Sequence, residues 1–277
     1  MRFRAPYSFS RAALGASLLL AGLLSQAQAQ ETNACFTGEG SVKEVLDGCA
    51  AFIAAGSTDT DRILRAHSIR AMALSAIGNL DAAIAEMDEA VKVDAAKPNL
   101  YFMRAAAYQA KKDYDKALAD LDQAIRLDAS HGDYFLLRGM VYRDKGDFNQ
   151  ALVDINEKVK LDPDAASGYS QRADVYRQRK EYDLSVADYD QVIKREPDAA
   201  KGYIGRGWVF VLKSDLDKAG ADFDKALELH QNDPSALVGR GVVRSRKGKP
   251  TDGTADLSLA QRLEPGIFDE IKKLGIE

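Results

Sequence analysis

The residues most able to do chemistry in this sequence are arginines and acids that recur together every 34 residues. The arginines are Arg70, Arg104, Arg138, Arg172, Arg206 and Arg240, and the acids are Glu86, Asp120, Asp154, Asp188, Asp222 and Asp256. A guanidinium can bind a carboxylate of the protein in a bidentate pair, or it can line a track for an anionic ligand. Because every arginine has an acid in matching register, we favour an internal ladder of ion pairs over a ligand track.

Two cysteines, Cys35 and Cys49, are the only thiols in the chain. An exported chain meets an oxidising compartment, where a close pair of cysteines usually forms a disulfide. A redox pair is the weaker alternative, because the spacing is not C-x-x-C and no flanking cation favours a thiolate. Two cysteines without a nearby histidine also make a poor zinc site. We therefore predict a structural disulfide.

Other reactive groups do not form a recognisable centre. None of His67, His131 and His230 is predicted to share a helix face with a second metal-ligating residue. The sequence contains no G-x-S-x-G motif and no P-loop, and no carboxylate pair stands out among its 42 acids. We therefore predict a protein that is not an enzyme and that holds no metal and no cofactor.

The N-terminus has the residue order of a secretory signal peptide. Three arginines accompany an apolar run of thirteen residues from Ala12 to Leu24, and a small-x-small cleavage site ends at Ala29. A retained membrane anchor is the alternative, but this run falls short of the roughly 20 residues that span a bilayer. We predict that residues 1–29 are removed, that no transmembrane segment remains, and that the protein is periplasmic or secreted.

The charge of the chain argues against one class of partner. The whole chain has a formal net charge of −4, and removal of residues 1–29 takes away three arginines and no acid, which gives −7. Nucleic acid needs a basic protein face for its phosphates. We therefore predict no nucleic-acid partner.

The charged residues must be positioned by a repeat of 34 residues that begins at Leu64 and runs without an insertion or deletion. Positions 8 and 20 of each unit are small, and positions 11 and 24 are mostly large and apolar or aromatic. Each unit has two amphipathic helical stretches separated by a turn. One such hairpin cannot bury its apolar face alone, so neighbouring units must stack into an all-α solenoid. The six units are 64–97, 98–131, 132–165, 166–199, 200–233 and 234–267.

This pattern, with its period of 34 residues, resembles the tetratricopeptide repeat. The resemblance covers residues 64 to about 267, which is most of the chain that follows the predicted signal peptide. It implies a right-handed superhelix of helix–turn–helix units, with a protein or peptide partner in the concave groove that the first helices line. The flanking segments are expected to be caps: a half-repeat over 30–63 that contains the disulfide, and a solvating segment over 268–277.

The resemblance also assigns candidate residues to the groove. They are Phe102, Leu136, Met140, Arg143, Asp174, Arg177, Ile204, Trp208, Val211 and Leu212. Trp208 is the only tryptophan, and an apolar patch with an aromatic centre is typical of binding hot spots. The alternative is that the last unit or the C-terminal segment covers this patch. Family members that clamp a peptide carboxylate carry lysine at position 5, and none stands there in this chain, so no carboxylate clamp is expected.

Two functions are compatible with this interpretation. The first is a non-catalytic interaction scaffold of the bacterial cell envelope that binds a peptide or protein in the groove. The second is an accessory or substrate-binding factor for an envelope polymer or an assembly machine. A stable protein partner would favour the first function, and retention on envelope glycan without a protein partner would favour the second.

Overall fold

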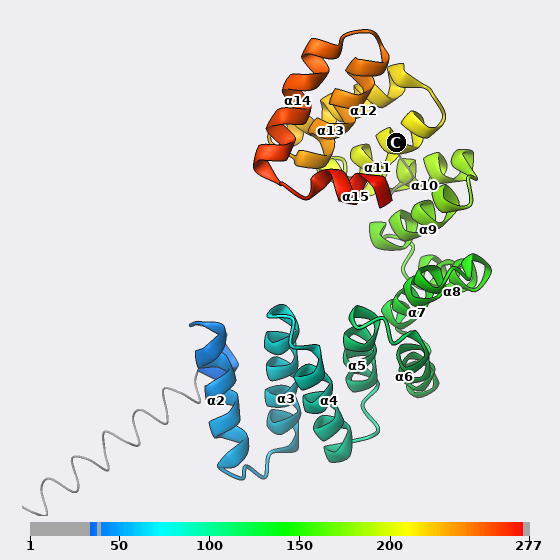
Figure 1. Ribbon diagram of the computed structural model, residues 1–277. Coiled ribbons are helices and arrows are strands. Elements are labelled where there is room, and N and C mark those ends of the chain that lie inside the picture. The colour runs from blue at the N-terminus through cyan, green and yellow to red at the C-terminus, as the bar shows by residue number, and fades with distance from the viewer. Residues whose placement is uncertain (1–33, 38–39, 274–277) are drawn as a thin grey trace, which may run out of the picture. The chain divides into compact units, whose positions relative to one another are not determined.

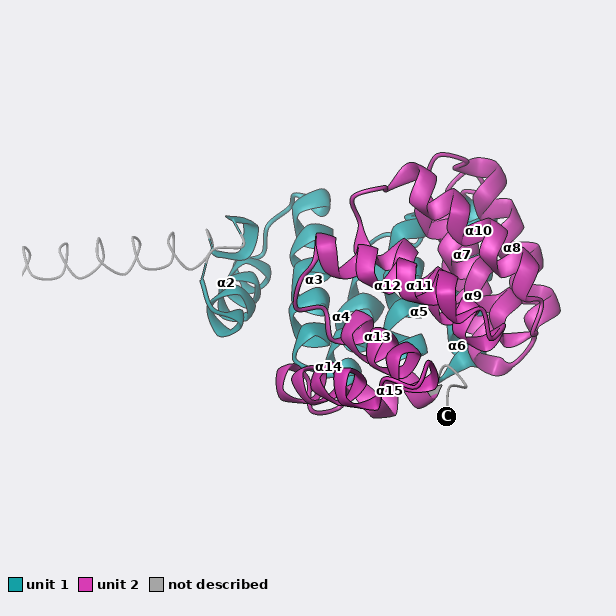
Figure 2. Cartoon of the chain, turned by 90° about the horizontal axis from the view of Figure 1, so that it is seen from above, with its two compact units in different colours: residues 1–127 teal, residues 128–277 magenta. Residues whose placement is uncertain are grey.

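The computed structural model describes residues 34–37 and 40–273, and the regular elements in these ranges are all helices (Figure 1). They follow one another in antiparallel pairs, which confirms the predicted all-α solenoid. The predicted signal peptide, residues 1–29, lies outside the described residues. The chain divides after Leu127 into two compact units, which Figure 2 shows in different colours.

The described part of the first unit, residues 34–37 and 40–127, contains an N-terminal segment with the disulfide, followed by two helix pairs. Each helix packs on the next one along the chain, and α3 also contacts α5. α3 begins ahead of Leu64, because Asp59 caps it by accepting a hydrogen bond from the Arg62 amide. The helices are α2 (Val42–Ala54), α3 (Thr60–Ala76), α4 (Leu80–Val93), α5 (Pro98–Ala110) and α6 (Tyr114–Leu127).

The described part of the second unit, residues 128–273, contains helix pairs and a short terminal helix. Consecutive helices again pack on one another throughout. The helices are α7 (Gly132–Lys145), α8 (Phe148–Leu161), α9 (Ala166–Gln178), α10 (Tyr182–Arg195), α11 (Ala200–Leu212), α12 (Leu216–Leu229), α13 (Pro234–Arg246), α14 (Pro250–Leu263) and α15 (Ile267–Lys273).

The two helices of a pair approach closely because small residues face each other at positions 8 and 20. A Cβ added to Gly139, at position 8, would lie 2.8 Å from Ile155 Cγ1 and 3.1 Å from the Ala151 carbonyl oxygen. Larger side chains here would separate the helices. Fully buried alanines hold position 20 at Ala83, Ala117, Ala151 and Ala219.

Position 15 of every unit, in the turn between the paired helices, has a positive φ angle. Glycine holds this position at Gly78, Gly146 and Gly248, with φ of 76°, 85° and 77°. The other units carry Lys112, Lys180 and Ser214, each with φ of 62°. The left-handed conformation costs a residue with a Cβ roughly 1–2 kcal/mol. The turns that carry a non-glycine residue at this position are therefore strained, and the turns that carry glycine are not.

The N-terminal cap is held by a disulfide, as predicted. Cys35 and Cys49 are bonded to each other and fully buried. Phe36 and Phe52 pack edge to face beside them, with ring centroids 4.9 Å apart. The Arg62 guanidinium of α3 lies over both rings. Aromatic and cation–π contacts thus join the cap to the first helix pair.

Replacing Ser214 with glycine should stabilise the protein by about 1 kcal/mol, because glycine adopts the left-handed conformation of the turn without a Cβ penalty. The matched control is Gly146→Ala at the equivalent turn, which should destabilise by a similar amount. Urea unfolding measures both changes. A destabilising Ser214→Gly would show that this turn is not strained.

The double substitution Cys35→Ala/Cys49→Ala should lower the stability of the cap by about 3 kcal/mol, the chain-entropy value for a loop of this size. Because repeat arrays are stabilised by contacts between neighbours, the loss should concentrate in α2 and α3. Residue-resolved hydrogen exchange measures it, with the amides of α12 and α13 as the control. An equal loss of protection in both units would contradict a local role for the disulfide.

Candidate functional site

In the second compact unit, within residues 128–273, the first helix of each helix pair lies along the same side of the stack. α7 contacts α9, α9 contacts α11, and α11 contacts α13. Within residues 128–273, no such contact joins α8, α10, α12 and α14 to one another. A stack whose first helices are closer together than its second helices must bend, with the first helices on the inner side. We call this inner side, formed by positions 2, 5, 9 and 12 of α7, α9, α11 and α13, the groove face.

The predicted residues of α7 form a partly exposed section of the groove face. Leu136 and Met140 are half-buried. Arg143 Nη1 donates to Gln171 Oε1 on α9 over 2.6 Å, and its Nη2 bonds to Asp144 Oδ1 at 2.9 Å. This section therefore combines apolar side chains with a guanidinium that its neighbours hold in place.

The predicted residues of α9 form a network with a buried tyrosine. Tyr189 Oη donates to Asp174 Oδ1 over 2.8 Å, and Arg177 Nη2 lies 3.5 Å from the same oxygen. The Tyr189 ring fills the space beside Gly205, where a Cβ would clash with it. Burial raises the pKa of Tyr189 well above its ordinary value, and the charge of Asp174 adds to the shift. Tyr189 therefore stays protonated and fixes Asp174 on the groove face.

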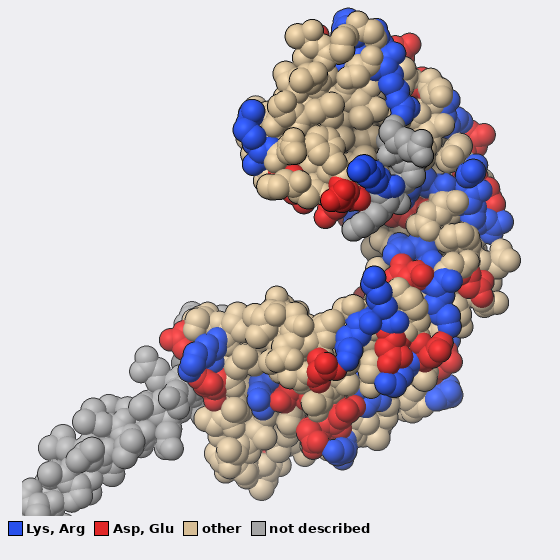
Figure 3. All heavy atoms as spheres, in the orientation of Figure 1, with Lys and Arg blue, Asp and Glu red and all other residues tan. Residues whose placement is uncertain are grey.

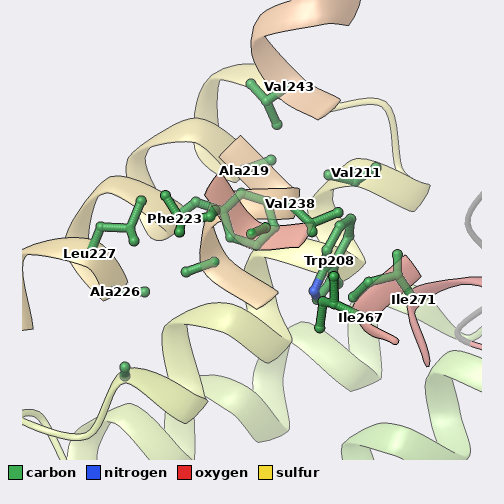
Figure 4. Packing of buried hydrophobic residues seen from close by; sticks show 14 of the residues in the cluster. Trp208, Val211, Ala219, Phe223, Ala226, Leu227, Val238, Val243, Ile267 and Ile271 are labelled. Atoms are coloured by element: carbon green, nitrogen blue, oxygen red, sulfur yellow. The ribbon is translucent and has the colours of Figure 1, made fainter. Parts of the chain in front are cut away.

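Trp208 is buried in this structure, which agrees with the alternative that the last unit or the C-terminal segment covers this patch. Its side chain is 2% exposed. The indole Nε1 donates to Ser235 Oγ on α13 over 3.2 Å, and the ring meets Phe223 edge to face at 5.0 Å. Ile267 and Ile271 of α15 pack against it in the same cluster (Figure 4). α13 and the C-terminal helix thus cover the patch.

The other predicted residues of α11 share this environment. Val211 is buried, and Ile204 and Leu212 are partly buried against the same cluster. The apolar side of α15 packs in the same cluster as these groove-lining residues, in line with the alternative that the C-terminal segment covers the patch. The period of the repeat does not reveal this, because α15 has no counterpart in the other units.

In the first unit, the corresponding inner side consists of α3 and α5. Phe102 of α5 is half-buried there. Met72 of α3 is 55% exposed and holds position 9, the position of Met140 and Trp208 in their units. Sequence reasoning missed Met72, although its place in the repeat could have identified it.

The recurrent arginines are bonded to the acids of their own units. In five units, Nε and Nη2 donate to the two carboxylate oxygens of an aspartate over 2.7–2.9 Å. Arg70 instead binds Glu86 Oε1 through Nη1 at 3.0 Å, and His67 Nδ1 lies 2.8 Å from the other oxygen of that carboxylate. The bidentate pairs are Arg104–Asp120, Arg138–Asp154, Arg172–Asp188, Arg206–Asp222 and Arg240–Asp256.

The guanidinium groups of these arginines are engaged in ion pairs within the protein. The hydrogen bond to Asp120 raises the pKa of Arg104 above its ordinary value, although burial opposes the shift. Asp222 has the same effect on Arg206. A guanidinium whose donors are taken up by protein carboxylates has little capacity left for an external anion. The geometry therefore favours the internal ladder over a ligand track.

Arg104, Arg172, Arg206 and Arg240 also reach the preceding unit, a contact that sequence reasoning missed. Nη1 of Arg104, Arg206 and Arg240 bonds to Asp88, Asp190 and Asp224 at 2.7, 2.5 and 3.4 Å. Nη1 of Arg172 donates to Asn156 Oδ1 over 2.8 Å. The signal in the sequence is position 25, which reads Asp88, Asp122, Asn156, Asp190, Asp224 and finally Ser258. One guanidinium thus joins the two helices of its hairpin to the hairpin before it.

A second column of contacts joins position 14 of one unit to position 18 of the unit before it. Lys111 pairs with Asp81, Lys213 with Asp183, and Lys247 with Asp217. Arg179 Nη1 donates to Asn149 Oδ1 over 3.0 Å. At both positions the unit 132–165 carries asparagine where the other units before the last carry aspartate. Its junction with unit 166–199 therefore uses neutral acceptors.

A hollow of about 560 Å³ lies beside the start of α7 and the end of α8. Lys158, which is buried at its edge, donates to Asp133 over 2.6 Å and to Asp162 over 2.7 Å. Burial lowers the pKa of Lys158, but these hydrogen bonds outweigh it and raise the pKa above its ordinary value. The ammonium is therefore charged and internally paired. Among residues 34–37 and 40–273, no cluster of three or more His, Cys, Asp or Glu side chains could hold a metal ion, and no helix has the length and apolar character needed to cross a bilayer.

Replacing Asn156 with aspartate should stabilise the second compact unit by about 0.5 kcal/mol. Arg172 would gain a charge pair with the preceding 34-residue repeat, like the pair that Arg206 makes with Asp190. The reciprocal control, Asp190→Asn, should cost about as much. Urea unfolding at low and high salt measures both, and the difference should shrink as salt screens the pair. Equal stability of the variants at low salt would show that the cross-unit charge contributes nothing.

Models of the tetratricopeptide repeat match residues 64–97, 98–131, 132–165 and 170–236. No curated protein matches the chain in sequence at a significant level. Several solved structures are similar in fold. A tetratricopeptide repeat protein from Parabacteroides merdae is 17% identical with a TM-score of 0.71, and the match covers 90% of this chain and 97% of that one.

Two further structures extend the comparison. PilF of Pseudomonas aeruginosa is 13% identical with a TM-score of 0.63, over 75% of this chain and 94% of that one. YrrB, described as a tetratricopeptide repeat protein with an unusual peptide-binding site, is 21% identical with a TM-score of 0.50, over 69% of this chain and 97% of that one. At these identities the likeness concerns the fold. Together with the matched repeats and the stacked helix pairs, it shows that the chain belongs to the tetratricopeptide repeat family.

Proposed function

We propose that the protein is a non-catalytic scaffold of the bacterial cell envelope that binds a peptide or protein partner on its groove face. The observation that carries the proposal is the partly exposed apolar pair Leu136 and Met140 on α7. Arg143 beside them and Asp174 on α9 are held by hydrogen bonds. An apolar centre with polar groups at fixed positions is typical of a protein-interaction surface.

The distribution of charge supports a protein partner. The arginine column is engaged in ion pairs within the solenoid, so it offers no basic track. On the face shown in Figure 3, basic and acidic side chains are interspersed over the helices. The formal net charge of −4 is also unsuited to a polyanion such as nucleic acid.

Two features support a place in the cell envelope. The first 29 residues have the order of a signal peptide. The Cys35–Cys49 disulfide suits an oxidising compartment outside the cytoplasm. The peptide-binding site named for YrrB, a protein of similar fold, adds support for a peptide or protein ligand.

Capture of a partner by groove variants tests the proposal. Residues 30–277, immobilised and exposed to the envelope fraction of the native bacterium, should retain a specific protein. Met140→Glu should reduce its capture roughly tenfold or more, because a carboxylate would be placed in the apolar centre of the contact. Val153→Glu is the matched control, since Val153 is 62% exposed on the second helix of the same hairpin.

Two outcomes of this experiment would contradict the groove assignment. One is equal capture by Met140→Glu and the unchanged protein, and the other is equal loss with Val153→Glu. Retention on purified envelope glycan, with no protein retained, would favour the accessory role instead.

A further inference from the structure

The C-terminal helix α15 occupies part of the groove face. It begins at Ile267, one residue before a seventh unit would begin, and it contacts α13 and α14. Ile267 and Ile271 also join the cluster around Trp208, which belongs to α11, two units earlier. Figure 4 shows both isoleucines beside the indole. α15 therefore folds back over the inner side of the stack.

Apolar residues that share the cluster of Ile267 and Ile271 hold groove-lining positions. Val238, Trp208 and Val211 stand at positions 5, 9 and 12 of their units and are 1%, 2% and 1% exposed. At positions 5 and 9 of the unit that contains α7, Leu136 and Met140 remain partly exposed. The same kind of surface is thus covered in one part of the second unit and accessible in another.

α15 is a short amphipathic helix. Its two buried isoleucines are four residues apart, which places them on one side of the helix, and Asp269, Glu270 and Lys272 are exposed. The helix has only seven residues, and an isolated helix of this length is unstable in water. Gly266, just before it, has open space where a Cβ would be. Because α13 and α14 also pack directly on each other, detachment of α15 would leave the contacts between these two helices in place.

We infer that the face of α11 and α13 around Trp208 is a binding site for an amphipathic helix, and that α15 keeps this site closed. The ligand that displaces α15 is a helix of a partner protein, and this helix presents aliphatic residues four positions apart, as α15 does. The inference rests on the proposed function, to which it adds the class of partner and a gate. A tethered segment acts at an effective concentration of roughly millimolar, so the partner helix must bury more apolar surface than α15 to displace it.

The only tryptophan of the chain reports on this site directly. In the full-length chain, I267D/I271D should expel α15, because two carboxylates cannot be buried against the indole without a partner. We expect the emission of Trp208 to move to longer wavelength and its quenching by acrylamide to increase. The matched control E270Q changes the exposed side of α15 and should leave both unchanged.

A peptide of residues 267–277 then serves as the ligand. Added to I267D/I271D, it should restore the original emission in a saturable titration, whereas the same peptide with both isoleucines replaced by aspartate should not. The unchanged protein should bind the peptide at least about tenfold more weakly, because its own α15 holds the site. Equal affinity for the two proteins would overturn the gate.

Other outcomes would overturn the site itself. One is unaltered Trp208 emission in I267D/I271D, and another is a peptide that fails to restore it. If circular dichroism shows that I267D/I271D is unfolded, the milder I271A takes its place with the same expectations. Unfolding of both would show that α15 is an obligatory structural cap. The fluorescence assay uses no partner and no residue of α7. A negative result in this assay therefore does not affect the capture test with Met140→Glu, and a negative capture test does not affect the fluorescence assay.

Discussion

The array depends on one side chain, the arginine at position 7 of each unit. Its guanidinium carries N–H donors in a rigid plane. In Arg206, for example, one edge binds Asp222 of the same hairpin and the remaining nitrogen binds Asp190 of the hairpin before it. Because the plane is rigid, the same group sets the spacing within a hairpin and the angle between hairpins. A lysine could make either contact but could not hold both in one geometry.

The positions that hold each hairpin together are therefore different from the positions that line the groove face. Positions 7, 8, 20 and 23 build the hairpin and are nearly uniform, and their charges are internally neutralised. Positions 5, 9 and 12 differ from unit to unit: apolar with an arginine on α7, polar on α9, and apolar on α11. The varied positions face inward along the first helices. Substitutions at positions 5, 9 and 12 can therefore change the groove face without disturbing the contacts that hold the stack together.

Periodicity determines which features could be predicted from the sequence. The helix pairs, the close approach at Gly139 and the pairing of Arg138 with Asp154 all follow from residues that recur at fixed spacing. The cross-unit contact to Asp190 also recurs, but the expected register concerned only facing positions within one hairpin. The burial of Trp208 has no periodic signal, because a single non-repeating helix causes it. The strain at Ser214 was equally hidden, since a turn was expected there but its φ angle was not.

The last unit differs from the others in a way that bears on assembly. Where earlier units offer aspartate or asparagine to the next arginine or lysine, it offers Ser258 and Thr251. Another copy of the chain that approached this end with its first hairpin would bring Arg70 to Ser258 and Ile77 to Thr251, so no charge pair would fix its register. Head-to-tail growth into an open filament, a hazard of any repeating surface, is thereby disfavoured by two residues.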